Sequence, residues 1–177
     1  MKATGIVRRI DDLGRVVIPK EIRRTMRIRE GEPLEIYTGV GGEVIFKKYS
    51  VMGEIAESAA AICEAISKNT AFAVLICDRD HCVSAAGLSK KEVLERRITP
   101  ELSALIEGRH AAKFGEEKGF LALEGVKRAV KFAVPIISAG DITGAVVLIE
   151  GEEQHPLEEC DMKLASMAAL FLGRQTE

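Results

Sequence analysis

The sequence predicts an α+β protein of two domains, residues 1–50 and 51–177, and three observations lead to this. Four short apolar segments and one short basic helix fill the first 50 residues, whereas the remainder follows the order helix, two strands, helical excursion, three strands, helix. A length of 177 residues suits one domain or two small ones. The net charge changes sign at the same boundary: residues 1–50 carry 11 Lys and Arg against 7 Asp and Glu, and residues 51–177 carry 14 Lys and Arg against 20 Asp and Glu.

Composition excludes several classes of protein. Apolar residues make up 47% and charged residues 29%, which is too apolar for a disordered chain. The longest apolar run, Ala71 to Cys77, is seven residues, far short of the roughly 18 that a membrane-spanning helix needs. The N-terminus shows no secretory signal, so we expect a cytoplasmic protein. Four cysteines at unrelated spacings and three scattered histidines predict reduced thiols, no metal site and no cofactor.

The N-terminal domain is expected to contain four strands and one helix. Apolar alternation interrupted by Asp, Gly and Pro places the strands at Ala3–Ile10, Val16–Ile18, Leu34–Tyr37 and Glu43–Phe46. Turns at Asp11–Gly14 and Gly39–Gly42 join them in pairs, and Pro19 precedes a helix at Lys20–Met26. A 50-residue unit without a disulfide or metal buries too little surface to be stable alone. We therefore expect a dimer in which strands are shared between chains.

Basic residues concentrate in this domain and point to a polyanion. Residues 1–29 hold nine Lys and Arg against three acidic residues. The spacing of Lys20, Arg23, Arg24 and Arg27 places them on one helix face, opposite Ile22 and Met26, which we expect to be buried. Arg8 and Arg15 flank the first turn, and Asp11 and Asp12 are interpreted as turn formers that hold them. Charge alone leaves a merely solvated basic face as the alternative.

Double-stranded DNA is one polyanion that this face would suit. The guanidinium fork fits phosphate oxygens and guanine edges, and a dimer would present the basic surface twice about a two-fold axis. Lys47 and Lys48 end the last strand, are expected to face the C-terminal half, and should matter little for DNA. The DNA-binding candidates are Arg8, Arg9, Arg15, Lys20, Arg23, Arg24 and Arg27.

Four segments of the N-terminal domain carry a resemblance to a known family. They are Lys2 to Arg8, Asp11 to Pro19 with its GRVVIP core, Ile22-Arg23-Arg24 and Leu34 to Tyr37. Together they resemble the AbrB-type swapped-hairpin DNA-binding domain. The resemblance implies an intertwined β-barrel dimer whose arginines dock on DNA, with Arg8, Arg15, Arg23 and Arg24 at DNA-contacting positions. Arg9 stands where that family has Lys or Arg.

Two helices of the C-terminal domain carry apolar stripes at 3-4-3-4 spacing. They are predicted at residues 51–68 and 157–172. Each stripe either packs on its own sheet or meets its copy in another chain, and the small residues around them favour a four-helix bundle within a homotetramer, with a dimer as the minimum unit. The candidate oligomerisation residues are Met52, Ile55, Ala59, Ile62, Ile66, Leu157, Leu164, Met167 and Phe171.

The segments between these helices predict an antiparallel sheet. Strands are expected at residues 71–77, 82–86, 119–123, 130–137 and 142–149, with residues 89–110 mostly helical and interrupted at Thr99-Pro100. The pair Phe132–Ile137 and Gly144–Ile149 resembles the last hairpin of GAF domains. That resemblance implies a small-molecule site between the sheet and the helical excursion, although these groups could equally be ordinary surface residues. Its candidate residues are Ser84, Gly87, Arg109 and His110.

The pairing of the two domains resembles the SpoVT-like family of endospore-forming bacteria. This implies a tetrameric, nucleoid-associated transcription factor that acts late in sporulation, in the forespore, as activator and repressor. The GAF-like part would be a sensor or an association module without catalysis. Two alternatives stay open. Some antitoxins use the same N-terminal fold, and some GAF-like proteins reduce free methionine sulfoxide with cysteines, although no base accompanies Cys77 and Cys82.

Overall fold

The computed structural model describes the chain except for residues 1–3, 51, 53–54, 116–118 and 177. It divides into two compact units, Met1–Tyr49 and Ser50–Glu177. Ser50, which the sequence places in the first domain, belongs to the second unit, where its hydroxyl donates to the carboxylate of Asp78 at 3.0 Å.

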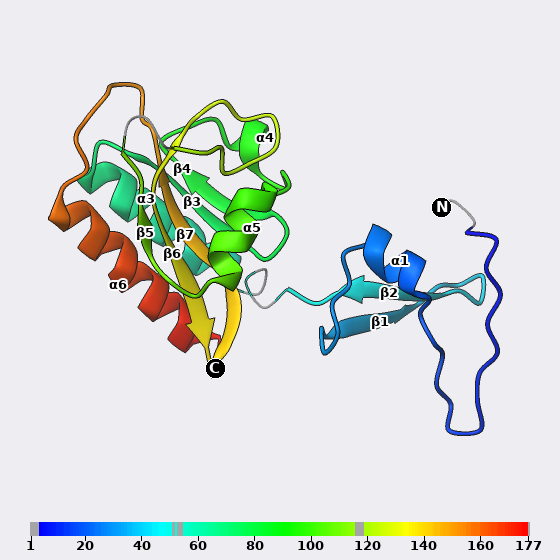
Figure 1. Ribbon diagram of the computed structural model, residues 1–177. Coiled ribbons are helices and arrows are strands. Elements are labelled where there is room, and N and C mark those ends of the chain that lie inside the picture. The colour runs from blue at the N-terminus through cyan, green and yellow to red at the C-terminus, as the bar shows by residue number, and fades with distance from the viewer. Residues whose placement is uncertain (1–3, 51, 53–54, 116–118, 177) are drawn as a thin grey trace. The chain divides into compact units, whose positions relative to one another are not determined.

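The described part of the first unit contains one helix and one strand hairpin (Figure 1). Helix α1 (Lys20–Thr25) follows Pro19, whose missing N–H costs nothing at a helix start. Strands β1 (Leu34–Thr38) and β2 (Val44–Lys48) pair antiparallel, with Leu34 opposite Lys48 and Thr38 opposite Val44. The predicted helix and second hairpin are thus confirmed.

The first predicted hairpin forms its turn but not its strands. Gly14 has φ +76°, its N–H donates to the Asp11 carbonyl at 3.1 Å, and the Asp11 N–H donates to the Arg15 carbonyl at 3.1 Å. On either side, residues 4–10 and 15–18 run as an open loop without a sheet partner (Figure 1), and Ala3 lies outside the described residues. The prediction of strands here is wrong for a single chain. An isolated two-strand ribbon is marginal in water, and among the described residues β1 and β2 pair only with each other and not with this segment.

The second unit is a five-stranded antiparallel sheet with helices on both faces (Figure 1). The strand order is β4-β3-β7-β6-β5. The strands are β3 (Ala73–Asp78), β4 (Cys82–Ala86), β5 (Ala112–Lys113), β6 (Val130–Ser138) and β7 (Asp141–Ile149). The predicted strand at 119–123 is wrong: Leu121 and Leu123 make only isolated bridges, to Ala129 and Ile98.

Within the described residues, four helices cover this sheet. Helices α3 (Ala56–Asn69) and α6 (Glu159–Gln175) lie on one face, and α4 (Lys90–Val93) and α5 (Pro100–Glu107) lie on the other (Figure 1). The predicted break at Thr99-Pro100 is the start of α5, where the Thr99 hydroxyl accepts from the Leu102 N–H. Helix α6 begins two residues later than predicted because Glu158 and Asp161 form a capping box around its first turn.

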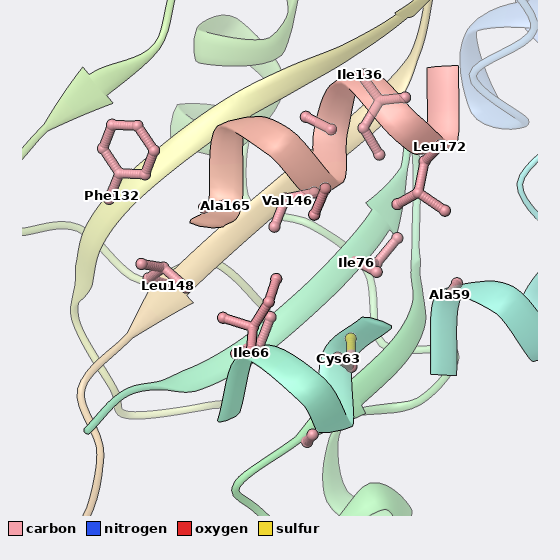
Figure 2. Packing of buried hydrophobic residues seen from close by; sticks show 14 of the residues in the cluster. Ala59, Cys63, Ile66, Ile76, Phe132, Ile136, Val146, Leu148, Ala165 and Leu172 are labelled. Carbon is pink, nitrogen blue, oxygen red and sulfur yellow. The ribbon is translucent and has the colours of Figure 1, made fainter. Parts of the chain in front are cut away.

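The sheet separates two apolar layers. Figure 2 shows the first, in which Cys63 and Ile66 of α3 and Leu172 of α6 lie over Ile76, Val146 and Leu148. Alternate residues of the same strands, including Leu75 and Val147, point to α4 and α5 on the other side. Strands β3 and β7 are therefore buried on both faces, which explains why Ala71 to Cys77 is an unbroken apolar run. None of the described helices is both long and apolar enough to cross a membrane.

Candidate nucleic-acid interface

The turn at residues 11–14 presents Arg15 in a fixed orientation. The carboxylate of Asp11 accepts from the Leu13 N–H at 3.1 Å and from the Arg15 N–H at 2.8 Å through one oxygen, and from Arg15 Nε at 2.7 Å through the other. The backbone and side-chain bonds from Arg15 lower the pKa of Asp11 below its ordinary value. Asp11 is thereby confirmed as a turn former that holds an arginine, and the Arg15 side chain stays 69% exposed.

The other basic candidates of the hairpin and helix differ in burial. Arg8 and Arg9 are exposed, and the Arg8 guanidinium donates to the Val7 carbonyl at 3.0 Å. On α1, Lys20 and Arg24 are exposed. Arg23 is half-buried, and its Nε has no acceptor among the described residues, a costly state for a buried donor.

Two expectations about α1 fail. Met26 is 60% exposed and Ile22 only half-buried, because a two-stranded hairpin in a single chain offers too little surface to cover both. Arg27 lies beyond the helix with φ +52°, so it does not continue the face of Lys20, Arg23 and Arg24.

The two lysines of β2 also separate. Lys47 lies over the Tyr37 ring, with Nζ 4.5 Å from the ring centroid. Lys48 instead donates to the Arg27 carbonyl at 2.6 Å and pairs with Glu32 at 3.3 Å, inside the first unit.

The candidate ligand residues are not brought together. Ser84 is buried against the Cys63 thiol of α3, and a Cβ added at Gly87 would lie 2.7 Å from Ser67 Oγ of α3. Arg109 and His110 are exposed beyond α5, where they bond to the carbonyls of Gly140 and Gly108. The prediction that these four residues form one site is therefore wrong. The side chains between the sheet and α4 and α5 are apolar, among them Leu75, Val93, Leu102, Ile106 and Val147.

Three of the four cysteines are buried thiols. Burial raises the pKa of Cys63 to about 12. Hydrogen bonding to Cys82 and burial raise the pKa of Cys77 well above its ordinary value. Cys63 and Cys77 therefore hold almost no thiolate at neutral pH, and Cys82 is buried, so the geometry does not favour the methionine sulfoxide reductase alternative. Among the described residues, no group of three His, Cys, Asp or Glu side chains could hold a metal ion.

The predicted oligomerisation stripes split between core and surface. Ala59 and Ile66 are buried in the chain's own core because α3 packs directly on the sheet, and Met52, which precedes α3, is buried in the same core. These three residues are therefore not available to a partner. Ile55, Ile62 and Leu157 pack against the same core, and Leu164 is half-buried. Met167 and Phe171 of α6 remain exposed, at 62% and 49%, together with Leu170, which sequence reasoning missed.

Both units of the chain are similar to known proteins. Residues 54–177 match the family model described as stage V sporulation protein T C-terminal, transcription factor. The whole chain is 45% identical over 179 residues to stage V sporulation protein T of Bacillus subtilis (strain 168), covering 100% of this chain and 99% of that protein. The chain belongs to the stage V sporulation protein T family. This membership confirms the function expected from the sequence, a DNA-binding regulator of sporulation genes.

Further matches concern the separate units of this family member. Residues 7–51 match the model of the bacterial antitoxin MazE, described as antidote-toxin recognition. The transition state regulatory protein AbrB of B. subtilis is 51% identical over 63 residues, 32% of this chain and 65% of AbrB. The GAF domain of an Acinetobacter phosphoenolpyruvate-protein phosphotransferase is similar in fold, with 12% identity, a TM-score of 0.54, and coverage of 72% of this chain and 82% of that domain. The match over residues 54–177 favours the transcription factor over the antitoxin alternative.

Proposed function

We propose that the first unit contacts double-stranded DNA through the arginines of its turn and helix. The observation that carries this is Arg15, which is highly exposed yet fixed by Asp11 on a unit of net positive charge. A guanidinium held in place loses less conformational freedom on meeting a phosphate or a guanine edge. The proposed contacts are Arg8, Arg9, Arg15, Lys20, Arg23, Arg24 and Arg27.

The minimum DNA-binding unit in this proposal is a dimer. Val7, Ile10 and Val17 of the open hairpin are 68–85% exposed, and Met26 of α1 is 60% exposed. A second copy whose hairpin pairs with this one would bury these side chains and complete a β-barrel. The dimer would also present Arg15 twice, as a palindromic site requires.

The second unit is proposed to join dimers into a homotetramer. Its support is the exposed apolar strip of α6, formed by Met167, Leu170 and Phe171.

A small-molecule sensing role rests on the GAF fold alone, and a thermal-shift screen of metabolites on the full chain tests it. Activation and repression of late, forespore-stage genes are proposed as the regulatory outcome, and mapping of bound DNA in sporulating cells tests that assignment.

Mobility-shift titration of operator DNA with the full chain tests the proposed face. Arg24→Ala removes an exposed arginine of α1, and Arg174→Ala removes an exposed arginine of the second unit as the matched control. Because each dimer would lack two arginines, Arg24→Ala should weaken binding by roughly tenfold to a thousandfold. The slope of log affinity against log salt should become shallower by about one for each phosphate that is no longer bound. Equal binding by the two variants would contradict the proposal.

A further inference from the structure

Helix α1 ends in a motif that fixes the backbone of two proposed DNA contacts. The Ile28 N–H donates to the Arg23 carbonyl at 2.7 Å, and the Arg27 N–H donates to the Arg24 carbonyl at 3.2 Å. This is the Schellman arrangement, in which the residue after the cap adopts a left-handed conformation. That residue is usually glycine, but here it is Arg27 with φ +52°. The two hydrogen bonds to the carbonyls of Arg23 and Arg24 therefore form only while Arg27 keeps this disfavoured backbone conformation.

Lys48 reaches this residue from the end of the hairpin. Its Nζ donates to the Arg27 carbonyl at 2.6 Å and lies 3.3 Å from Glu32 Oε1. The Glu32 side chain is only 9% exposed, and its other oxygen accepts from the Arg29 N–H at 2.7 Å. We call the Lys48 ammonium, the Glu32 carboxylate and the Arg27 carbonyl the Lys48 clamp. It joins β2, the loop before β1 and the left-handed residue after α1.

The surroundings of Lys48 argue against a direct phosphate contact. Its side chain is 24% exposed, and its charge is already paired with a carboxylate. Lys47, next to it in the same strand, shows the contrast. Successive strand residues point to opposite faces, and Lys47 lies over Tyr37 on the face of the hairpin opposite to Lys48. The two adjacent lysines thus carry the same charge in different roles.

We infer that Lys48 and Glu32 are positioning residues for DNA binding: the Lys48 clamp holds Arg27 in its left-handed conformation and so orients the last turn of α1 with Arg23 and Arg24. The inference rests on the proposed function of those two arginines. Without the clamp, the strained residue relaxes, the Schellman bonds loosen, and the arginines sample orientations that do not match the DNA.

Opposite charge changes test this inference in the full chain. Lys48→Met and Glu32→Gln should each weaken operator binding by roughly 5- to 30-fold in mobility-shift titrations, because each breaks a charged, partly buried contact. Lys47→Met is the matched control and should stay within about twofold. Charge alone predicts the opposite sign for Glu32→Gln, since removing a negative charge favours a polyanion. Tighter binding by Glu32→Gln, or equal losses in Lys47→Met and Lys48→Met, would overturn the inference.

A double-mutant cycle tests whether Lys48 acts through the strained backbone of Arg27. Glycine adopts positive φ at little cost, so the loss caused by Lys48→Met should shrink to about twofold in an Arg27→Gly background, whatever Arg27 itself contributes to DNA binding. Hydrogen exchange should show faster amides over residues 23–28 in Lys48→Met while β1 and β2 stay protected. An undiminished loss in the Arg27→Gly background, or general exposure of both strands, would overturn the positioning role.

The proposed function and this inference can fail separately. Arg24→Ala serves as the reference arm of the same titration. If it binds operator DNA like the unaltered chain, the proposed DNA face is wrong. If it loses affinity while Lys48→Met and Glu32→Gln do not, the DNA face stands and the Lys48 clamp has no positioning role.

Discussion

Arg15 binds Asp11 twice, through its backbone N–H to one carboxylate oxygen at 2.8 Å and through its side-chain Nε to the other at 2.7 Å. One acidic residue thereby determines both the local turn and the direction of an exposed guanidinium. An acidic group inside a DNA-binding face ordinarily opposes binding. Here its negative charge is offset by the arginine that it orients.

We predict that Asp11→Ala weakens operator binding, although it removes a negative charge from the face. Loss of the turn and of the Arg15 orientation should cost roughly two- to twentyfold in affinity per dimer, measured by mobility shift. Asp12→Ala is the matched control. It removes the same charge from the same turn, and within the described residues Asp12 makes no bond to Arg15. Its binding should be unchanged or tighter, and weaker binding by both variants to the same extent would refute the orienting role.

The same pair predicts a pH dependence. Because Arg15 lowers the pKa of Asp11 below its ordinary value of 3.8, the interaction is fully present above that value and is lost as the pH falls through the lowered pKa. An NMR titration of the Asp11 carboxyl carbon should give a pKa below 3.8 in the unaltered chain. Arg15→Ala removes the side-chain bond but keeps the backbone N–H of residue 15, the larger cause, so the Asp11 pKa should rise but stay below 3.8. An unshifted Asp11 in the unaltered chain would contradict these bonds.

The sequence predicts most of the second unit because its elements are stabilised within the chain. The apolar run at Ala71–Cys77 and the pair at 130–149 emerge as β3, β6 and β7, since both faces of these strands are covered by helices of the same unit. The strand expected at 119–123 fails because Leu121 and Leu123 make isolated bridges to two different segments, at Ala129 and Ile98, whereas Ala112 and Lys113 pair with β6 at the edge position. Alternation alone does not tell an edge strand from an extended loop.

The candidate sites are less predictable, for local reasons. The helical spacing that groups Arg27 with Lys20 and Arg23 assumes that the helix continues, and no glycine marks the left-handed turn that ends it. The apolar stripe of α3 has the same period whether it faces a sheet or another helix, and the structure places Ala59 and Ile66 on the sheet. Ser84 and Arg109 are separated because the sheet lies between α3 and α5, which spacing cannot reveal.

Thiol reactivity gives a prediction for the second unit. Cys160 is exposed, whereas Cys63, Cys77 and Cys82 are fully buried. Iodoacetamide at neutral pH should therefore alkylate Cys160 alone in the native chain, because burial holds the pKa of Cys63 near 12 and hydrogen bonding with burial raises that of Cys77. Mass spectrometry of peptides measures the modification, and a urea-unfolded sample, in which all four should react, is the control. Rapid native labelling of Cys77 or Cys82 would contradict the buried arrangement.

The contact between α6 and β6 predicts a stability change of unusual sign. A Cβ added at Gly173 would lie 2.2 Å from the Ile137 carbonyl oxygen. Glycine to alanine in a helix ordinarily stabilises by up to about 1 kcal/mol. Here overlap with a backbone atom should dominate, and Gly173→Ala should lower the free energy of unfolding of the second unit by about 1–3 kcal/mol. Urea unfolding measures this, and Gly115→Ala, where nothing lies within 4 Å, is the control. A more stable Gly173→Ala variant would refute the close contact.

The exposed strip of α6 gives the final prediction, on assembly. Met167 and Phe171 are exposed on the chain's own surface, at 62% and 49%, so Met167→Glu and Phe171→Glu together should leave the fold intact. In a tetramer the same carboxylates would be buried without partners at an interface, and that cost should release N-terminal dimers. Light scattering should then report about half the mass of the unaltered assembly, with unchanged thermal unfolding of the second unit. Lys163→Glu is the control, since Lys163 is an exposed residue of α6 whose side chain pairs with Glu159 at 2.6 Å, and it should leave the mass unchanged. A tetramer that survives Met167→Glu and Phe171→Glu would show that α6 does not form the interface, and a 19.2 kDa monomer in the unaltered chain would exclude the dimer as well.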